Sequence, residues 1–170
     1  GLQFAEIAKD AHVLDCGCGG GANIRKLLKM CPNGVVKGVD YSPVSVEKAK
    51  KVNEDAILNG RCVILRGNVS DLIFAANRFD LVTAFETVYF WPGLPRCFGE
   101  VFRVLKPGGT FFICNESSGD TDKDDKWTEM IDGMTIYRDV QLKQTLEQSG
   151  FHDVQIYKNS KGWLCVTARK

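Results

Sequence analysis

The stretch that decides the fold is residues 13–22, which read VLDCGCGGGA. A short apolar run ends at Asp15, and four glycines follow within the next six residues. Glycine adopts left-handed backbone angles at little cost and lets another molecule approach the main chain closely. Apolar residues then recur at helical spacing through Ala22–Met30. The segment therefore predicts a strand, a tight glycine-rich turn and a helix.

Strands and helices continue to alternate on the C-terminal side of this unit. The expected strands are apolar runs bounded by turn residues, at His12–Asp15, Val35–Val39, Cys62–Leu65, Phe79–Ala84, Thr110–Cys114, Val154–Tyr157 and Trp163–Ala168. The expected helices have one apolar face, at Ala22–Met30, Pro43 to about Leu58, Pro95–Leu105 and Asp139–Ser149. This alternation predicts an α/β fold with a largely parallel sheet. The short polar connection Lys158–Gly162 favours an antiparallel hairpin for the last two strands.

Length and composition indicate one globular domain over residues 1–170. Hydrophobic residues make up 44% of the chain and charged residues 25%, as is usual for globular proteins. The net charge is +1, so no basic field is present to hold a nucleic-acid backbone, and we expect no nucleic-acid partner. The longest apolar runs, such as residues 111–114, are too short to span a membrane, and we expect no membrane partner.

The seven cysteines are an odd number, and most lie in apolar runs. We expect free buried thiols and a reducing, cytoplasmic setting. Cys16 and Cys18 are spaced like metal ligands, but no second Cys/His pair follows at the spacing of a zinc site. The sequence therefore predicts no metal site.

Ligands of parallel α/β sheets bind at the carboxyl ends of the strands. Asp40 directly follows the second predicted strand, where a carboxylate can accept hydrogen bonds from a ribose diol. Gly17-x-Gly19-x-x-Ala22 also fits the dinucleotide fingerprint. Asp15 distinguishes a dinucleotide from a cationic cofactor as the ligand, because an acid there would repel a pyrophosphate and attract a cation such as S-adenosylmethionine.

Five segments, in order, resemble motifs of the class I S-adenosylmethionine-dependent methyltransferases: residues 13–21, Gly38–Ser42, Arg66–Val69, Phe79–Phe85 and Leu105–Gly109. The resemblance covers about residues 11–170, although many relatives have Asp where this chain has Asn68. It implies a Rossmann-like, doubly wound, seven-stranded sheet that is mostly parallel, with an antiparallel C-terminal strand. Family members usually have one or two helices before the glycine motif. Only Gly1 to Ala11 precede it here, so we expect those cap helices to be missing.

The resemblance also implies roles at the cofactor. The residues expected to bind S-adenosylmethionine are Asp15, Gly17, Gly19, Asp40, Tyr41, Asn68, Val69 and the backbone of Phe85. In this assignment the two glycines lie against the methionine part, and Asp15 supports the loop or the ammonium group. Asp40 takes the ribose hydroxyls, Tyr41 packs on the adenine, and Asn68 and Val69 bind the adenine edge.

The expected reaction is in-line transfer of the methyl group of S-adenosylmethionine to a small-molecule acceptor, with release of S-adenosylhomocysteine. Residues 86–92, reading ETVYFWP, should border the methyl group. Glu86 is the titratable group in this segment and is the candidate general base or acceptor-binding residue. The aromatic residues of segment 86–92 could shape a pocket or belong to the core. The segment has no Asn-Pro-Pro-Tyr pattern of the kind found in methyltransferases that act on adenine or glutamine amino groups, which favours a small acceptor.

Three alternatives stay open at this point. Residues Trp127, Met130, Met134 and Tyr137 could cover the acceptor site or form an ordinary packed connection. The chain could bind S-adenosylmethionine without catalysis, as a sensor or a partner subunit. It could also be a nicotinamide-dependent oxidoreductase, which Asp15 and the terminal hairpin disfavour. The sequence does not specify an oligomeric state.

Overall fold

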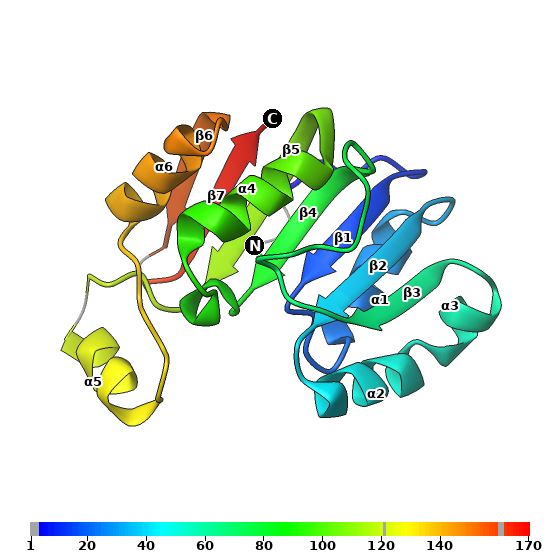
Figure 1. The fold of residues 1–170 in the computed structure, drawn as a ribbon, viewed down its shortest axis with the longest axis horizontal. Coiled ribbons are helices and arrows are strands. Elements are labelled where there is room, and N and C mark those ends of the chain that lie inside the picture. Colours follow the sequence, from blue (N-terminus) through cyan, green and yellow to red (C-terminus); the bar gives the residue numbers. More distant parts are fainter. Residues whose placement is uncertain (1–3, 121, 160–161) are drawn as a thin grey trace.

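One sheet of seven strands organises the residues that the structure, a computed structural model, describes: 4–120, 122–159 and 162–170. The strands stand in the order β3-β2-β1-β4-β5-β7-β6 (Figure 1). Their bounds are β1 His12–Cys16, β2 Val35–Asp40, β3 Cys62–Arg66, β4 Phe79–Phe85, β5 Leu105–Asn115, β6 His152–Lys158 and β7 Leu164–Arg169. The helices are α1 Ala22–Met30, α2 Pro43–Val52, α3 Glu54–Leu58, α4 Leu94–Val104, α5 Asp122–Met130 and α6 Asp139–Gln148, with a short 3-10 turn, η2, at Val88–Phe90.

The sheet confirms the predicted Rossmann-like topology. Strands β1 to β5 pair in parallel, and β7 is antiparallel to both of its neighbours, β5 and β6. The predicted hairpin is therefore present, but its second strand lies inside the sheet and β6 forms the edge. Burial explains this placement, because Leu164, Cys165 and Val166 are buried in succession along β7, as expected of a strand that is covered on both faces.

Helices cover both faces of the sheet, which makes the fold doubly wound. On one face, α4 and α6 pack Phe98, Leu142 and Leu146 against sheet residues such as Phe111. On the other face, α1 and α2 bury residues such as Ile24 against β1 and β2. Complete burial of one such side chain contributes roughly 1.5–3 kcal/mol, so these two apolar layers hold the strands that position the site.

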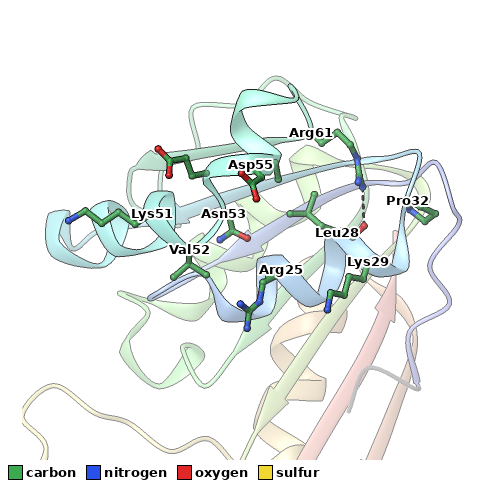
Figure 2. Close-up of a pocket in the computed structure, with 11 residues that line it drawn as sticks. Arg25, Leu28, Lys29, Pro32, Lys51, Val52, Asn53, Asp55 and Arg61 are labelled. Carbon is green, nitrogen blue, oxygen red and sulfur yellow. Dashed lines mark hydrogen bonds between the residues drawn. The ribbon is translucent and has the colours of Figure 1, made fainter.

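The structure corrects the predicted helix from Pro43 to Leu58, which breaks at Asn53 into α2 and α3. The Asn53 side chain is buried, and its Nδ2 donates hydrogen bonds to the carbonyl oxygens of Gly21, at 3.0 Å, and Ala49, at 2.9 Å. A side chain that bonds nearby backbone competes with helical hydrogen bonding. Asn53 therefore interrupts the helix and fixes the end of the glycine loop against α2; Figure 2 shows it at the α2–α3 junction, next to α1.

Other bounds also differ from the prediction. Strand β5 begins at Leu105 rather than Thr110, because Leu105 pairs with Phe79 and the register then shifts before Leu81. Helix α5 begins in the polar stretch at 117–128 and is not among the helices predicted above. Figure 1 shows α5 set apart from the sheet, on the side to which the arrowheads of β4 and β5 point. In the described part of the chain, every helix is too short or too polar to cross a membrane.

We expect Asn53→Ala to lower the free energy of unfolding by about 1–3 kcal/mol, because two buried hydrogen bonds from its amide disappear. Urea denaturation monitored by circular dichroism measures this change. Asn59→Ala, at an exposed position just after α3, is the matched control and should stay within about 0.5 kcal/mol of wild type. Equal effects of the two substitutions would show that Asn53 does not hold the α2–α3 junction.

Candidate functional site

A cavity of about 370 Å³ opens at the carboxyl ends of β1, β2, β3 and β4. Its size lies within the range of small-molecule sites. Most of its lining comes from the loops that follow these strands, and the rest from the turn after α5: Gly17, Asp40, Tyr41, Gly67, Asn68, Val69, Thr87, Phe90, Trp91, Pro92, Asp132 and Gly133. The cavity thus lies where the sequence predicts a ligand, at the strand ends of a parallel sheet.

The Asp40 carboxylate joins two of these loops. Its Oδ2 accepts a hydrogen bond from the Gly19 N–H at 2.8 Å, and its Oδ1 accepts one from the Ser42 N–H at 2.9 Å. The N–H groups of Gly17 and Cys18 donate to the Val39 carbonyl oxygen at 2.8 and 3.0 Å. A carboxylate has about four acceptor positions, so Asp40 can hold both loops and still accept hydrogen bonds from a ligand in the cavity.

Two glycines of the loop have different structural requirements. Both have positive φ, 73° at Gly17 and 51° at Gly19, which favours glycine over other residues. A Cβ atom at Gly17 would overlap the Thr87 side chain, whereas a Cβ at Gly19 would meet nothing within 4 Å. Close approach between the glycine loop and the segment after β4 therefore depends on Gly17, while Gly19 contributes a backbone conformation and the hydrogen bond to Asp40.

Asp15 lies fully buried near the end of β1, two residues before Gly17 of the cavity lining. Its Oδ1 accepts a hydrogen bond from the Thr83 hydroxyl at 2.7 Å, whereas Oδ2 is buried without a hydrogen-bond partner among the described residues. Burial raises the pKa of Asp15 to about 7; the Thr83 hydrogen bond opposes this effect and the charge of Asp40 adds to it. A buried carboxylate with a free oxygen is suited to a cation or a hydrogen-bond donor that approaches from the cavity.

The adenine side predicted from the sequence is also at the cavity. Asn68 and Val69 line it, and Asn68 Oδ1 accepts hydrogen bonds from the N–H and the hydroxyl of Ser70, both at 3.0 Å. Tyr41 lines it with a largely exposed ring. These three residues therefore line the same cavity as Gly17 and Asp40.

The aromatic segment after β4 contributes both to the cavity wall and to the core, the two roles that the sequence left open. Val88 is completely buried, and Trp91 is buried in the core cluster while also touching the cavity. Phe90 lines the cavity with 44% of its surface exposed. The Trp91 indole N–H donates to the Thr87 hydroxyl at 3.2 Å, which fixes the wall opposite Gly17.

Glu86 lies beside the cavity and outside its lining. Its φ is 56°, and its Oε2 accepts hydrogen bonds from the Glu116 N–H at 3.0 Å and the Tyr89 hydroxyl at 3.3 Å. The Tyr89 hydroxyl in turn accepts a hydrogen bond from the Ser117 N–H at 2.9 Å. Partial burial raises the pKa of Glu86. The carboxylate thus connects the end of β4 to the segment after β5, next to the cavity wall at Thr87.

Four of the nine predicted site residues are not in the cavity lining: Asp15, Gly19, Phe85 and Glu86. Phe85 packs its ring against Phe112 at a centroid distance of 5.7 Å, which leaves its backbone as the part with a predicted role. Asp132 and Gly133 also line the cavity, although they were not predicted from the sequence. An Asp-Gly pair is a turn signal, and it was the one local indication that the chain reverses at this point.

The residues considered as a possible cover of the acceptor site lie partly in solvent and partly against the core. Trp127 and Met130 of α5 are exposed, and Tyr137 packs against the α4–α6 core cluster. The Thr135 N–H donates to the Tyr89 carbonyl oxygen at 2.9 Å. This hydrogen bond brings the turn after α5 to the cavity, so that the backbone around Gly133 forms its border.

A second cavity, of about 430 Å³, lies between α1 and the α2–α3 junction (Figure 2). Charged residues of both signs surround it, among them Arg25, Lys51 and Asp55. The Arg61 guanidinium donates to the Leu28 carbonyl oxygen at 2.9 Å and caps the end of α1. These contacts are structural, and the cavity lies away from the strand ends, so we assign it no ligand.

Known proteins resemble this chain at the level of one domain. The family model described as "Methyltransferase domain" matches residues 14–113. Sterol 24-C-methyltransferase erg-4 of Neurospora crassa is 35% identical over 107 residues, which are 63% of this chain and 28% of that protein. Demethylmenaquinone methyltransferase of Symbiobacterium thermophilum is 36% identical over 108 residues, or 63% of this chain and 43% of that protein. The chain thus spans less than half the length of these two relatives.

Solved structures share the fold at lower sequence identity. A methyltransferase described as putative, in complex with the Trm112 methyltransferase activator of Haloferax volcanii, superposes with a TM-score of 0.90 at 22% identity, covering 99% of this chain and 85% of that one. A SAM-dependent methyltransferase from Aquifex aeolicus superposes with a TM-score of 0.83 at 21% identity, covering 98% and 86%. These likenesses support the fold described above.

The raised pKa of Asp15 predicts a specific pH dependence of stability. The folded protein holds a proton on Asp15 up to about pH 7, whereas the unfolded chain releases it near pH 3.8. Rising pH across this interval therefore favours unfolding, by at most about 1.4 kcal/mol per pH unit. Asp15→Asn removes the titration, so the stability of wild type relative to this variant should fall between about pH 4 and pH 7 and level off above that.

Urea denaturation at a series of pH values measures this difference. Asp55→Asn, at an exposed carboxylate in α3, controls for the loss of one charge. A difference between wild type and Asp15→Asn that does not change with pH would contradict the prediction.

Proposed function

The chain belongs to the methyltransferase-domain family, and we propose that it transfers a methyl group from S-adenosylmethionine to a small-molecule acceptor, releasing S-adenosylhomocysteine. The observation that carries the proposal is the cavity at the strand ends, because its lining includes Gly17, Asp40, Asn68 and Thr87. All four positions lie inside the stretch that matches the family, residues 14–113. Of the twelve residues that line the cavity, all but Asp132 and Gly133 thus lie inside the family match.

The charges at the cavity support S-adenosylmethionine over a nicotinamide dinucleotide. The described residues of the lining include Asp40 and Asp132 and no Lys, Arg or His, and the buried Asp15 lies two residues before Gly17 of this lining. Such an acidic surface repels a pyrophosphate and attracts an ammonium or sulfonium group. The free Asp15 Oδ2 and the spare acceptor positions of Asp40 fit a ligand that carries a cation and ribose hydroxyls.

In this reaction the residues of the chain would bind and orient S-adenosylmethionine. S-adenosylmethionine, when bound, supplies a methyl group already activated by its sulfonium. Asp40 and the glycine loop would hold the ribose and amino acid parts, while Tyr41, Asn68 and Val69 would hold the adenine. Positioning and the exclusion of water then account for most of the rate in an in-line displacement. Phe90 and Trp91 form an apolar wall, and aromatic faces also attract cations.

Glu86 is the proposed general base where the acceptor must lose a proton. Its pKa is raised by burial, which brings a carboxylate closer to the range in which it can take a proton at neutral pH. It is one residue from Thr87, which lines the cavity. An acceptor that reaches past Thr87 would meet this carboxylate.

For the acceptor we propose a small, largely apolar molecule. Phe90, Trp91 and Pro92 give the cavity an apolar side. The relatives named above carry the names of a sterol and of a demethylmenaquinone methyltransferase, both of which refer to apolar acceptors. The alternative is a domain that binds S-adenosylmethionine as a sensor or as a subunit of a larger methyltransferase.

Turnover separates these two functions. The protein is incubated with S-adenosylmethionine and a panel of sterols, quinones and small amines, and S-adenosylhomocysteine is measured by mass spectrometry. We expect product with at least one apolar acceptor. Calorimetric binding of S-adenosylmethionine without product across the panel would favour the non-catalytic alternative, and absence of binding would refute the cofactor assignment.

Gly17→Ala should weaken binding of S-adenosylmethionine by at least about tenfold, or about 1.4 kcal/mol. The added Cβ overlaps Thr87, so the cavity wall has to move. Gly60→Ala is the matched control, because φ is positive there too, the Cβ meets nothing within 4 Å and the residue is outside the cavity lining. It should change the affinity by no more than about threefold. Isothermal titration calorimetry measures both, and an equal effect of the two substitutions would contradict the role assigned to Gly17.

Glu86→Gln should leave the affinity for S-adenosylmethionine within about twofold, because the amide oxygen can accept the same hydrogen bonds from Glu116 and Tyr89. If Glu86 takes a proton in the transition state, turnover should fall by roughly 10²–10⁴ and the acidic limb of the pH–rate profile should disappear. Glu116→Gln, at an exposed neighbouring carboxylate, should behave as wild type. A retained acidic limb with near-normal turnover would make Glu86 a structural link only.

A further inference from the structure

Two of the seven buried cysteines have their sulfur atoms in contact. Cys114 lies in β5 and Cys165 in β7, and their Sγ atoms are 3.4 Å apart. Other thiols donate to backbone carbonyl oxygens; Cys31, for example, donates to Leu27 at 3.2 Å. The contact between Cys114 and Cys165 is therefore a thiol–thiol hydrogen bond across two strands, formed by residues 51 positions apart in the chain.

The backbone places these side chains at the spacing that a disulfide requires. Cys114 and Cys165 are directly opposite in the antiparallel register of β5 and β7. Facing residues of antiparallel strands have Cα atoms about 4.5–5.5 Å apart, which lies within the span of about 4.4–6.8 Å found for disulfides. The sulfurs need to approach by roughly 1.3 Å to reach bonding distance, a change that side-chain rotation can supply.

Aromatic residues neighbour the pair on both sides. On the same row of the sheet, Phe85 of β4 is opposite Cys114, and Tyr157 of β6 is opposite Cys165. Phe4 stacks on Tyr157 with ring centroids 4.2 Å apart. The two cysteines keep only 7% and 6% of their surfaces exposed. A reaction at this pair therefore requires an oxidant as small as hydrogen peroxide.

The shared hydrogen bond also makes the two sulfurs unequal. In this contact the Cys165 thiol donates to the Cys114 sulfur, and the shared hydrogen bond lowers the pKa of Cys165 and raises the pKa of Cys114. The thiolate is the nucleophilic form of cysteine. Cys165 is thus the sulfur that attacks an oxidant, and Cys114 is the resolving thiol.

We propose that Cys114 and Cys165 are a redox modification site, at which a small hydroperoxide converts the thiol pair into a reversible cross-strand disulfide. The Cys165 thiolate attacks the peroxide O–O bond and becomes a sulfenic acid, while the second oxygen leaves as hydroxide and takes up a proton to form water. The Cys114 sulfur then attacks the sulfenic sulfur, its proton and the hydroxyl leave as a second water, and the S–S bond forms. Two thiols are oxidised and one peroxide is reduced; an external thiol reverses the change.

The pair adjoins the proposed active site, although the proposal does not depend on the proposed function. The Glu86 N–H donates to the Cys114 carbonyl oxygen at 3.0 Å, and the N–H groups of Glu116 and Ser117, just beyond, hold Glu86 and Tyr89. A disulfide would fix this end of β5 to β7. The redox state of the pair is thus connected to the position of Glu86 through two residues of backbone.

Peptide mapping tests the proposal on the intact protein. Reduced protein is treated with about one equivalent of hydrogen peroxide, free thiols are alkylated under denaturing conditions, and non-reduced digests are analysed by mass spectrometry. We expect a linked Cys114–Cys165 peptide that is about 2 Da lighter than the two thiol peptides together, and that dithiothreitol separates. Both cysteines remaining fully alkylated in protein that circular dichroism shows to be folded, or a disulfide to another cysteine, would overturn the proposal.

Single variants test the assigned order of attack. In Cys114→Ala, dimedone should trap a sulfenic acid on Cys165, at a yield at least about tenfold above that on Cys114 in Cys165→Ala. Cys62→Ala, at a buried thiol in β3, is the matched control and should form the linked peptide as wild type does. The wild-type mapping decides the proposal even where a variant does not fold, and a disulfide lost in Cys62→Ala would contradict the pairing.

Discussion

One carboxylate, that of Asp40, holds together the two loops on which the rest of the site depends. It accepts hydrogen bonds from Gly19 in the glycine loop and from Ser42 at the start of α2. Both N–H groups lack a partner in regular secondary structure, and an ionised acceptor bonds such groups more strongly than a neutral one. Because β1 and β2 are neighbours in parallel register, this one side chain fixes the distance between the first two strand ends, and with it the floor of the cavity.

Most of the fold could be predicted from the sequence because its signals are local. Each central strand is an apolar run closed by a turn residue, and the short connection before Trp163 favours a hairpin. The break at Asn53 could not be predicted in the same way, because one of its hydrogen-bond partners, Gly21, lies 32 residues earlier in the chain. The family resemblance implied the seven-stranded sheet, and its antiparallel C-terminal strand agrees with the hairpin that the local pattern favours.

The site residues also divide into those that local sequence patterns predict and those that tertiary contacts bring to the cavity. Gly17, Asp40 and Asn68, which the sequence predicts as cofactor-binding residues, line the cavity because each lies at or soon after the end of a parallel strand, where the topology directs a ligand. Asp132 belongs to a turn that a tertiary hydrogen bond, from Thr135 to Tyr89, brings to the cavity. Glu86 was chosen for its place in the sequence, but its carboxylate is held by the Glu116 N–H beside the cavity, a contact that no spacing rule contains.

The acidic residues at the cavity lower the stability of the fold locally and are suited to a cationic ligand. Asp15 is buried, has one oxygen without a partner among the described residues, and lies close enough to Asp40 for like charge to raise its pKa. A purely structural position would be more stable with a neutral or fully paired side chain. Near neutral pH such an acid is divided between its charged and neutral forms. A cationic ligand in the cavity would favour the charged form, so that binding releases a proton and relieves the unsatisfied oxygen. The features of Asp15 that lower the stability of the protein would therefore also make the site prefer a cation.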